Sequence, residues 1–76
     1  VQNTKTFPIP AKNSLNINNV NNYQFMSIFD VSGSMLMSGN LDDGYNQIDI
    51  SSLNNGTYVL HLIGDQTTFN QTIIVE

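Results

Sequence analysis

Residues 54–63 read NNGTYVLHLI, and this stretch decides the fold. The Asn-Gly dipeptide near its start is typical of a tight turn that leads into a strand. The residues after the turn alternate between the two faces of an extended chain. The face that we expect to point inward carries Tyr58, Leu60 and Leu62. The opposite face carries His61, which this orientation leaves toward water. The pattern therefore predicts a half-buried β-strand over residues 57–63.

Segments of the same kind flank this strand on both sides. Period-2 or aromatic-rich patterns predict strands around Leu15 and Ile17, over residues 23–29, at Met35-Leu36-Met37, around Ile48 and Ile50, and over residues 67–75. Stretches rich in Asn, Asp and Gly separate them, at residues 18–22, 30–33, 39–44 and 64–66. In the turn after residue 30, Gly33 can take the left-handed conformation that a tight turn needs. The segment Phe7-Pro8-Ile9-Pro10 is predicted to be extended and to lie at an edge, because each proline removes an amide donor.

Six or seven short strands with turn signals about every 8–12 residues predict an all-β domain. No window shows the spacing of an amphipathic helix. The pattern is compatible with a sandwich or a barrel, and the short hairpins and small size favour an antiparallel β-sandwich of two sheets. The predicted core consists of Leu15, Ile17, Met26, Ile28, Leu36, Ile48, Ile50, Leu53, Tyr58, Leu60, Leu62, Ile73 and Val75.

Composition excludes several classes of function. The chain has 76 residues, enough for one domain, and its net charge is −4 with two lysines and no arginine. Nucleic acids and anionic membranes are therefore poor partners, because both require clustered basic residues. With no cysteine there is no disulfide and no thiolate ligand. No apolar run approaches the roughly 20 residues of a membrane span. The first residues do not show the basic, apolar and small-residue pattern of a signal peptide, and we expect any export signal to lie upstream. Because residue 1 is Val, we expect the chain to be a piece of a longer precursor.

Candidate catalytic and metal sites find little support. The single histidine, His61, lies in mid-strand, and no G-x-S-x-G motif accompanies the many serines. The acidic pair Asp42-Asp43 lies in a turn, where Asp commonly bonds its own backbone. We therefore expect no enzyme, no cofactor and no catalytic or metal residue. One alternative stays open: the loop at residues 40–44 (NLDDG) gathers oxygen ligands of the kind that calcium prefers, without the EF-hand spacing.

Six motifs in order resemble a known family. They are FPIPAK at residues 7–12, Leu15-x-Ile17, IFDVSG at 28–33, IDISSL at 48–53, NGTYVL at 55–60 and a final IIV at 73–75. Together they resemble the C-terminal sorting domain of proteins exported by the type IX secretion system (the Por system, type A) of Bacteroidetes. The resemblance covers residues 7–76. The chain departs from the usual family pattern at Ile9, at Asn13 and at the acidic terminal residue Glu76.

The resemblance implies an immunoglobulin-like sandwich of about seven strands over residues 7–76, with residues 1–6 as a linker or a first extended arm. It implies that the domain directs a covalently linked upstream cargo to the outer-membrane translocon, by way of a shuttle protein and without inserting into the membrane. A sortase-like peptidase then removes it, and the route runs through the periplasm to the cell surface or the medium. The family motif residues would be Pro8, Pro10, Ala11, Asp30, Gly33, Leu53, Gly56 and Tyr58. Recognition is assigned to the terminal strand, at Ile73, Ile74, Val75 and Glu76.

A mechanism follows from the position of that strand: a receptor could pair with its backbone by β-augmentation. Two other readings stay open. The first is an immunoglobulin-like adhesive or carbohydrate-binding module of a surface protein, in which exposed Tyr23, Phe25 or Tyr45 would stack on sugar rings. The second is a fragment of an enzyme whose catalytic residues lie elsewhere.

Overall fold

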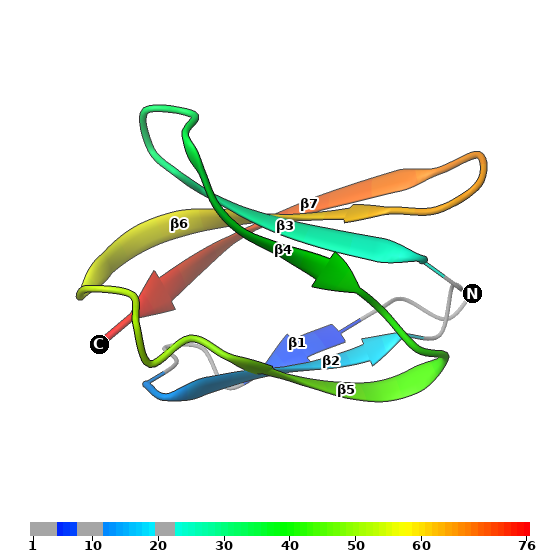
Figure 1. The fold of residues 1–76 in the computed structure, drawn as a ribbon, viewed down its shortest axis with the longest axis horizontal. Helices are drawn as coiled ribbons and strands as arrows, with labels where there is room; N and C mark the ends of the chain where they lie inside the picture. Colours follow the sequence, from blue (N-terminus) through cyan, green and yellow to red (C-terminus); the bar gives the residue numbers. More distant parts are fainter. Residues whose placement is uncertain (1–4, 8–11, 20–22) are drawn as a thin grey trace.

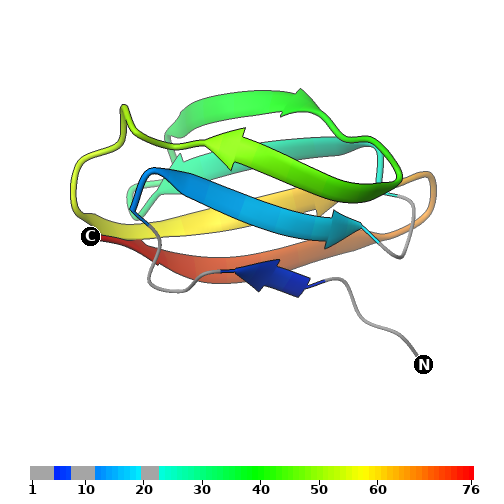
Figure 2. The ribbon, with the colours of Figure 1, turned by 90° about the horizontal axis from the view of Figure 1, so that it is seen from below.

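The computed structural model describes residues 5–7, 12–19 and 23–76, and all regular structure in them is β. One sheet has three strands in the order β1-β2-β5, formed by Lys5–Phe7, Ser14–Asn19 and Gly44–Asp49. The other has four strands in the order β4-β3-β6-β7, formed by Met35–Asn40, Phe25–Asp30, Gly56–Ile63 and Thr68–Val75. The two sheets lie face to face (Figure 1), and Figure 2 shows the same layers from below. The predicted all-β sandwich is confirmed.

Every strand pair is antiparallel, and the connections β2–β3, β4–β5 and β5–β6 pass from one sheet to the other. Such crossings interlock the two sheets in immunoglobulin-like sandwiches. The predicted strand at residues 57–63 is β6, which pairs with β3 on one side and β7 on the other. It therefore lies inside the larger sheet. The three-stranded sheet begins at Lys5, within the segment that was expected to be a linker or an extended arm.

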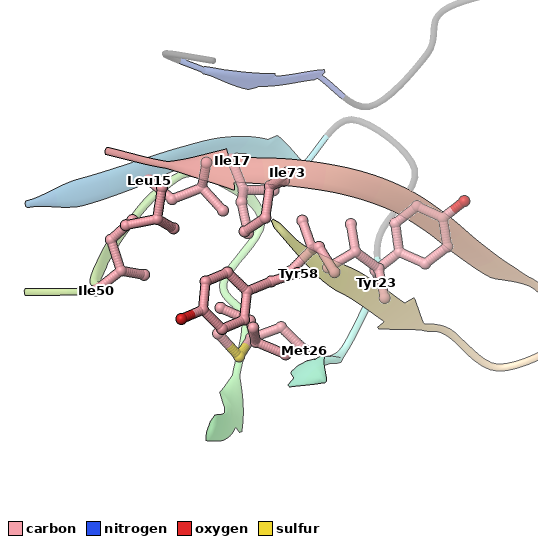
Figure 3. Close-up of a cluster of buried hydrophobic side chains, with 11 residues drawn as sticks. Leu15, Ile17, Tyr23, Met26, Ile50, Tyr58 and Ile73 are labelled. Carbon is pink, nitrogen blue, oxygen red and sulfur yellow. The ribbon is translucent and has the colours of Figure 1, made fainter. Parts of the chain in front are cut away.

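The core fills the space between the sheets with alternate residues of the strands. On β6, Leu60 and Leu62 are fully buried and Tyr58 is 8% exposed, so the predicted inward face is confirmed. On β2 of the smaller sheet, Leu15 and Ile17 are also fully buried. Figure 3 shows Leu15 and Ile17 close to Ile50 and Ile73 in this cluster. Ile48 and Leu53 are partly buried and pack against this cluster. Each fully buried aliphatic side chain contributes about 1.5–3 kcal/mol.

The prediction that Leu36 belongs to the core is wrong. Leu36 is 45% exposed, and its neighbour Met37 packs against the core in its place. The cause is an irregularity in the β3–β4 pairing: Ile28 opposes Met37 but Phe29 opposes Met35, which leaves Leu36 as an extra residue on β4. A β-bulge of this kind shifts the alternation of side chains by one position. β4 also continues to Asn40, so the turn predicted over residues 39–44 is confined to 41–43.

The expectation that Tyr23 is exposed is also wrong. Tyr23 precedes β3 and is only 6% exposed, with its ring 6.2 Å from that of Phe69 on β7. The other two aromatic residues that we expected to be exposed, Phe25 and Tyr45, are 48% and 62% exposed. These two cannot form one platform, because Phe25 belongs to the larger sheet and Tyr45 to the smaller one.

Candidate recognition surface

The predicted recognition strand, β7, forms one edge of the larger sheet (Figure 1). Within the described part of the chain its single strand neighbour is β6. The four predicted recognition residues divide into two kinds. Ile73 is fully buried and Val75 is 2% exposed, whereas Ile74 is 43% exposed and Glu76 is exposed. A partner can therefore reach two of these side chains, while the other two attach the strand to the core.

The backbone of β7 presents a second set of groups. The turn of the β6–β7 hairpin is closed by a hydrogen bond from the Gly64 N–H to the Thr67 carbonyl at 2.9 Å. Antiparallel pairs alternate between bonded and non-bonded, so counting from this closure directs every second residue of β7 away from β6. The residues so directed, here called the open edge, are Thr68, Asn70, Thr72 and Ile74. The same alternation turns the Ile63 carbonyl toward β3, where it accepts from the Gln24 N–H at 2.8 Å.

Two of the family motif residues build the β3–β4 turn. Asp30 Oδ1 accepts hydrogen bonds from the Ser32 hydroxyl at 2.6 Å, the Ser32 N–H at 2.9 Å and the Ser34 N–H at 3.0 Å. The Ser32 hydroxyl and these backbone donors lower the pKa of Asp30 below its ordinary 3.8. Gly33 has a φ of 93°, the left-handed conformation predicted for it. Both residues shape the turn.

Three further motif residues lie at the β5–β6 corner. Tyr58 donates a hydrogen bond from its hydroxyl to the Asn54 carbonyl at 2.6 Å, four residues upstream. A tyrosine near the start of this strand, bonded back to the chain before it, is the tyrosine corner of immunoglobulin-like folds. Leu53 is partly buried, and its N–H donates to the Ile50 carbonyl at 3.0 Å. Gly56 begins β6 and pairs with Val75 of the terminal strand.

The corner is preceded by a second carboxylate-capped turn. Asp49 Oδ1 accepts from the Ser51 hydroxyl at 2.7 Å and from the Ser51 N–H at 2.9 Å. The Ser51 hydroxyl is the main reason that the pKa of Asp49 is lowered, and the backbone donor adds to it. The remaining motif residues, Pro8, Pro10 and Ala11, lie outside the described residues.

Two buried asparagines are structural residues that sequence reasoning missed. Asn19, 2% exposed, donates to the carbonyls of Tyr23 at 2.7 Å and Asp42 at 3.0 Å, and it accepts from the Tyr23 N–H at 2.9 Å. Asn46 accepts from the Asp42 N–H at 2.9 Å and donates to the carbonyls of Asp42 at 2.9 Å and Gly44 at 3.1 Å. Both occupy inward positions in their strands. A polar residue in the inward phase of an alternating pattern was the available signal.

The asparagine network bears on the calcium alternative. The Asp42 carbonyl already accepts from the side chains of both Asn19 and Asn46, which occupy its two lone pairs. In residues 5–7, 12–19 and 23–76, no three His, Cys, Asp or Glu side chains gather closely enough to hold a metal ion.

The same residues contain no helix of the length and apolarity needed to span a membrane.

His61 lies on the outer surface of the larger sheet, as its alternation predicted. It opposes Ser27 of β3 and Asn70 of β7, and its ring lies 6.3 Å from that of Phe29. No carboxylate stands opposite it in either pairing. The orienting acid of a catalytic triad is therefore missing from its cross-strand neighbours.

Comparison with known proteins assigns this fold to a family. Residues 5–76 match the family described as the secretion system C-terminal sorting domain. No curated protein was found that matches the chain as a relative. The match confirms the resemblance carried by the six sequence motifs. This family is one of sorting signals and is not a catalytic one. The chain therefore belongs to the C-terminal sorting domains of type IX secretion, a family that directs export to the cell surface or beyond.

Proposed function

We propose that this domain is a passive address label that directs a covalently linked upstream cargo to the outer-membrane type IX translocon. It performs no reaction of its own and acts by being bound. Family membership supports the sorting role. The observation that carries the mechanism is β7, an eight-residue strand that has β6 as its one strand neighbour in the described residues, with its open edge directed away from β6. Such an edge is a ready template for pairing with another chain.

The partners follow from this assignment. A shuttle protein in the outer membrane receives the domain from the periplasm and passes it to the translocon. A sortase-like peptidase then removes the domain and leaves the cargo at the cell surface or in the medium. These steps require a compact label without chemistry of its own.

Recognition takes place by β-augmentation along the open edge. A receptor strand that pairs with Thr68, Asn70, Thr72 and Ile74 gains main-chain hydrogen bonds without disturbing the β6–β7 ladder. Ile73 and Val75 hold β7 in place from the core side, while the Ile74 and Glu76 side chains contact the receptor. Asp30, Gly33, Leu53, Gly56 and Tyr58 keep the sandwich folded. Pro8, Pro10 and Ala11 remain predicted family motif residues.

A reporter assay tests the sorting role. Residues 1–76 are fused behind a reporter protein that has its own signal peptide, in a host with and without the type IX machinery. Export that requires both the fusion and the machinery supports the proposal. Equal export of the reporter without the domain refutes it.

A proline substitution tests the edge mechanism separately. Thr72→Pro removes an N–H on the open edge, a position where an edge strand tolerates proline. Thr72→Ala is the matched control, because it shortens the side chain and keeps the N–H. We expect export to fall about tenfold or more for Thr72→Pro, the effect of losing a central contact, and to persist for Thr72→Ala. Thermal unfolding by circular dichroism confirms that both variants are folded. Full export of folded Thr72→Pro would exclude pairing at this edge.

A further inference from the structure

The two outer surfaces of the sandwich differ in chemistry. The outer surface of the smaller sheet carries Asn16, Asn18, Tyr45, Gln47 and Asp49, which alternate with the inward residues of β2 and β5. On the larger sheet, the strands carry exposed large hydrophobic side chains at Phe25, Met35, Leu36, Ile63 and Ile74. In the described part of the smaller sheet, Tyr45 is the one such side chain. Apolar surface is thus concentrated on one side of the molecule.

The apolar side chains of the larger sheet are cross-strand neighbours. Phe25, 48% exposed, stands directly opposite Ile63, 37% exposed. Two outward rows further along, beyond the row of Ser27 and His61, Phe29 stands between Met35 on β4 and Val59 on β6. We name these five apolar residues the apolar face. Aromatic residues and methionine are enriched at protein interfaces relative to the rest of the surface.

The acidic residues of the larger sheet lie outside the apolar face. The acidic residues of the larger sheet lie at its two ends: Asp30 closes β3, Asp65 occupies the β6–β7 turn, and Glu76 follows β7. No lysine or arginine occurs anywhere in residues 23–76. Two copies stacked through this face would bring acidic margins together, which is unfavourable. This distribution favours a different protein with an apolar centre and basic margins.

The apolar face also continues into the open edge. The side chains of Thr68, Asn70, Thr72 and Ile74 project on the same outer side, in the rows that contain Ile63, His61, Val59 and Thr57. A strand added beyond β7 would extend this surface by one strand. A partner that pairs with the open edge can therefore also contact the apolar face, because the outward side chains of both lie on the same surface of the larger sheet.

We infer that the apolar face is the second contact of the export receptor, whose complementary surface is apolar at its centre and basic at its margins. This inference rests on the proposed sorting function. It places the determinants of binding on β3 and β6 as well as on the terminal strand. Phe25 and Ile63 are the residues of this face to test first, because they are an exposed and directly opposed pair.

The test uses the reporter fusion with a double substitution and a control on the opposite side. Phe25→Thr with Ile63→Thr removes the apolar pair and retains strand propensity. Tyr45→Thr, at an exposed aromatic residue of the smaller sheet, is the control. We expect at least about a tenfold loss of export for the double variant, the size expected for central interface residues, and unchanged export for Tyr45→Thr. Unfolding midpoints establish that the secreted and non-secreted variants are folded.

The outcomes separate the two proposals. If the unmodified fusion is not exported, the sorting function fails. If it is exported and the folded double variant is exported equally, the sorting function stands and the apolar face is excluded as a contact. Concentration-dependent self-association in sedimentation, abolished by the double substitution, would instead identify a second copy as the occupant and overturn the inference.

A pair of charge reversals tests the basic margin. Asp65→Lys changes an acidic residue at the end of the larger sheet, and Asp43→Lys makes the same change in net charge in the β4–β5 loop. We expect export to fall about threefold or more for Asp65→Lys, as for a reversed charge at an interface rim, and to stay unchanged for Asp43→Lys. Equal export of both variants would refute a basic margin on the receptor.

Discussion

Replacement of Tyr58 by Phe isolates one hydrogen bond of the fold. The Tyr58 hydroxyl donates to the Asn54 carbonyl at 2.6 Å, and the ring is buried with 8% of the residue exposed. Phenylalanine keeps the ring in the core, so the packing contribution is retained. The carbonyl that loses its donor belongs to an exposed residue and can bind water instead. The expected loss is therefore that of one hydrogen bond, about 1 kcal/mol.

The loss is measurable because the domain is small. For chains of this size, about 1 kcal/mol corresponds to a fall in Tm of roughly 4–8 °C. Tyr45→Phe is the matched control: it also removes a tyrosine hydroxyl, which bonds Asn16 at 2.7 Å, but at a residue that is 62% exposed. Surface changes of that kind alter stability by less than about 0.5 kcal/mol.

Urea unfolding followed by far-ultraviolet circular dichroism provides the assay. The midpoint should fall for Tyr58→Phe with an unchanged slope, which shows that stability changed and the exposed surface did not. Equal midpoints for Tyr58→Phe and Tyr45→Phe would refute the corner as a stabilising element. The reasoning would also fail if Tyr58→Phe lowered the slope, because the substitution would then have altered more than one bond.

Two further predictions concern polar groups. Asn19→Ala removes three hydrogen bonds inside the fold and should lower the free energy of unfolding, measured in urea, by about 3 kcal/mol. The control is Asn18→Ala, one position away on the exposed side, which should change stability by less than about 0.5 kcal/mol. Similar values for the two variants would contradict a stabilising role of the Asn19 hydrogen bonds. Asp30 and Asp49 have pKa values lowered in the folded state, so their contribution to stability is present above the ordinary pKa of 3.8 and is lost as the pH falls from there through the lowered folded-state pKa. Between neutral pH and pH 2.5, the unfolding midpoint should decrease less for the Asp30→Asn, Asp49→Asn double variant than for the unmodified domain. An equal decrease in both proteins would show that these two carboxylates do not cause the loss of stability in acid.

Local pattern predicted most of the fold, because period-2 alternation depends only on neighbouring residues. It assigned the faces of β6 correctly, including the outward position of His61. It failed at Leu36, because the bulge there is decided by how β3 and β4 align, and neither strand encodes that alignment alone. It failed at Tyr23 for a related reason: that ring is covered by Phe69, which lies on a strand more than forty positions later.

The recognition strand illustrates a different limit. The motifs pointed to Ile73, Ile74, Val75 and Glu76 as one unit, but a strand presents alternate residues to opposite sides. Ile73 and Val75 are enclosed in the core, and Ile74 is partly exposed. The backbone groups of the open edge have no signature in the amino-acid sequence, because they depend on which strand lies beside β7. The apolar face was missed for the same reason, since Phe25 and Ile63 become neighbours only when β3 pairs with β6.

The dual position of β7 has a consequence for how export signals of this kind must be dissected. Val75 pairs with Gly56 at the tyrosine corner, and Ile73 is fully buried, so the last strand closes the sandwich. A truncation that removes these residues therefore destroys the core together with the edge, and its loss of export cannot distinguish a missing contact from an unfolded domain. Substitutions confined to the outward residues, such as Thr72, keep the core side chains and remove only what a receptor could contact. A receptor that pairs with this edge binds a strand that exists only in the folded sandwich, so the proposed mechanism makes folding itself a condition for export.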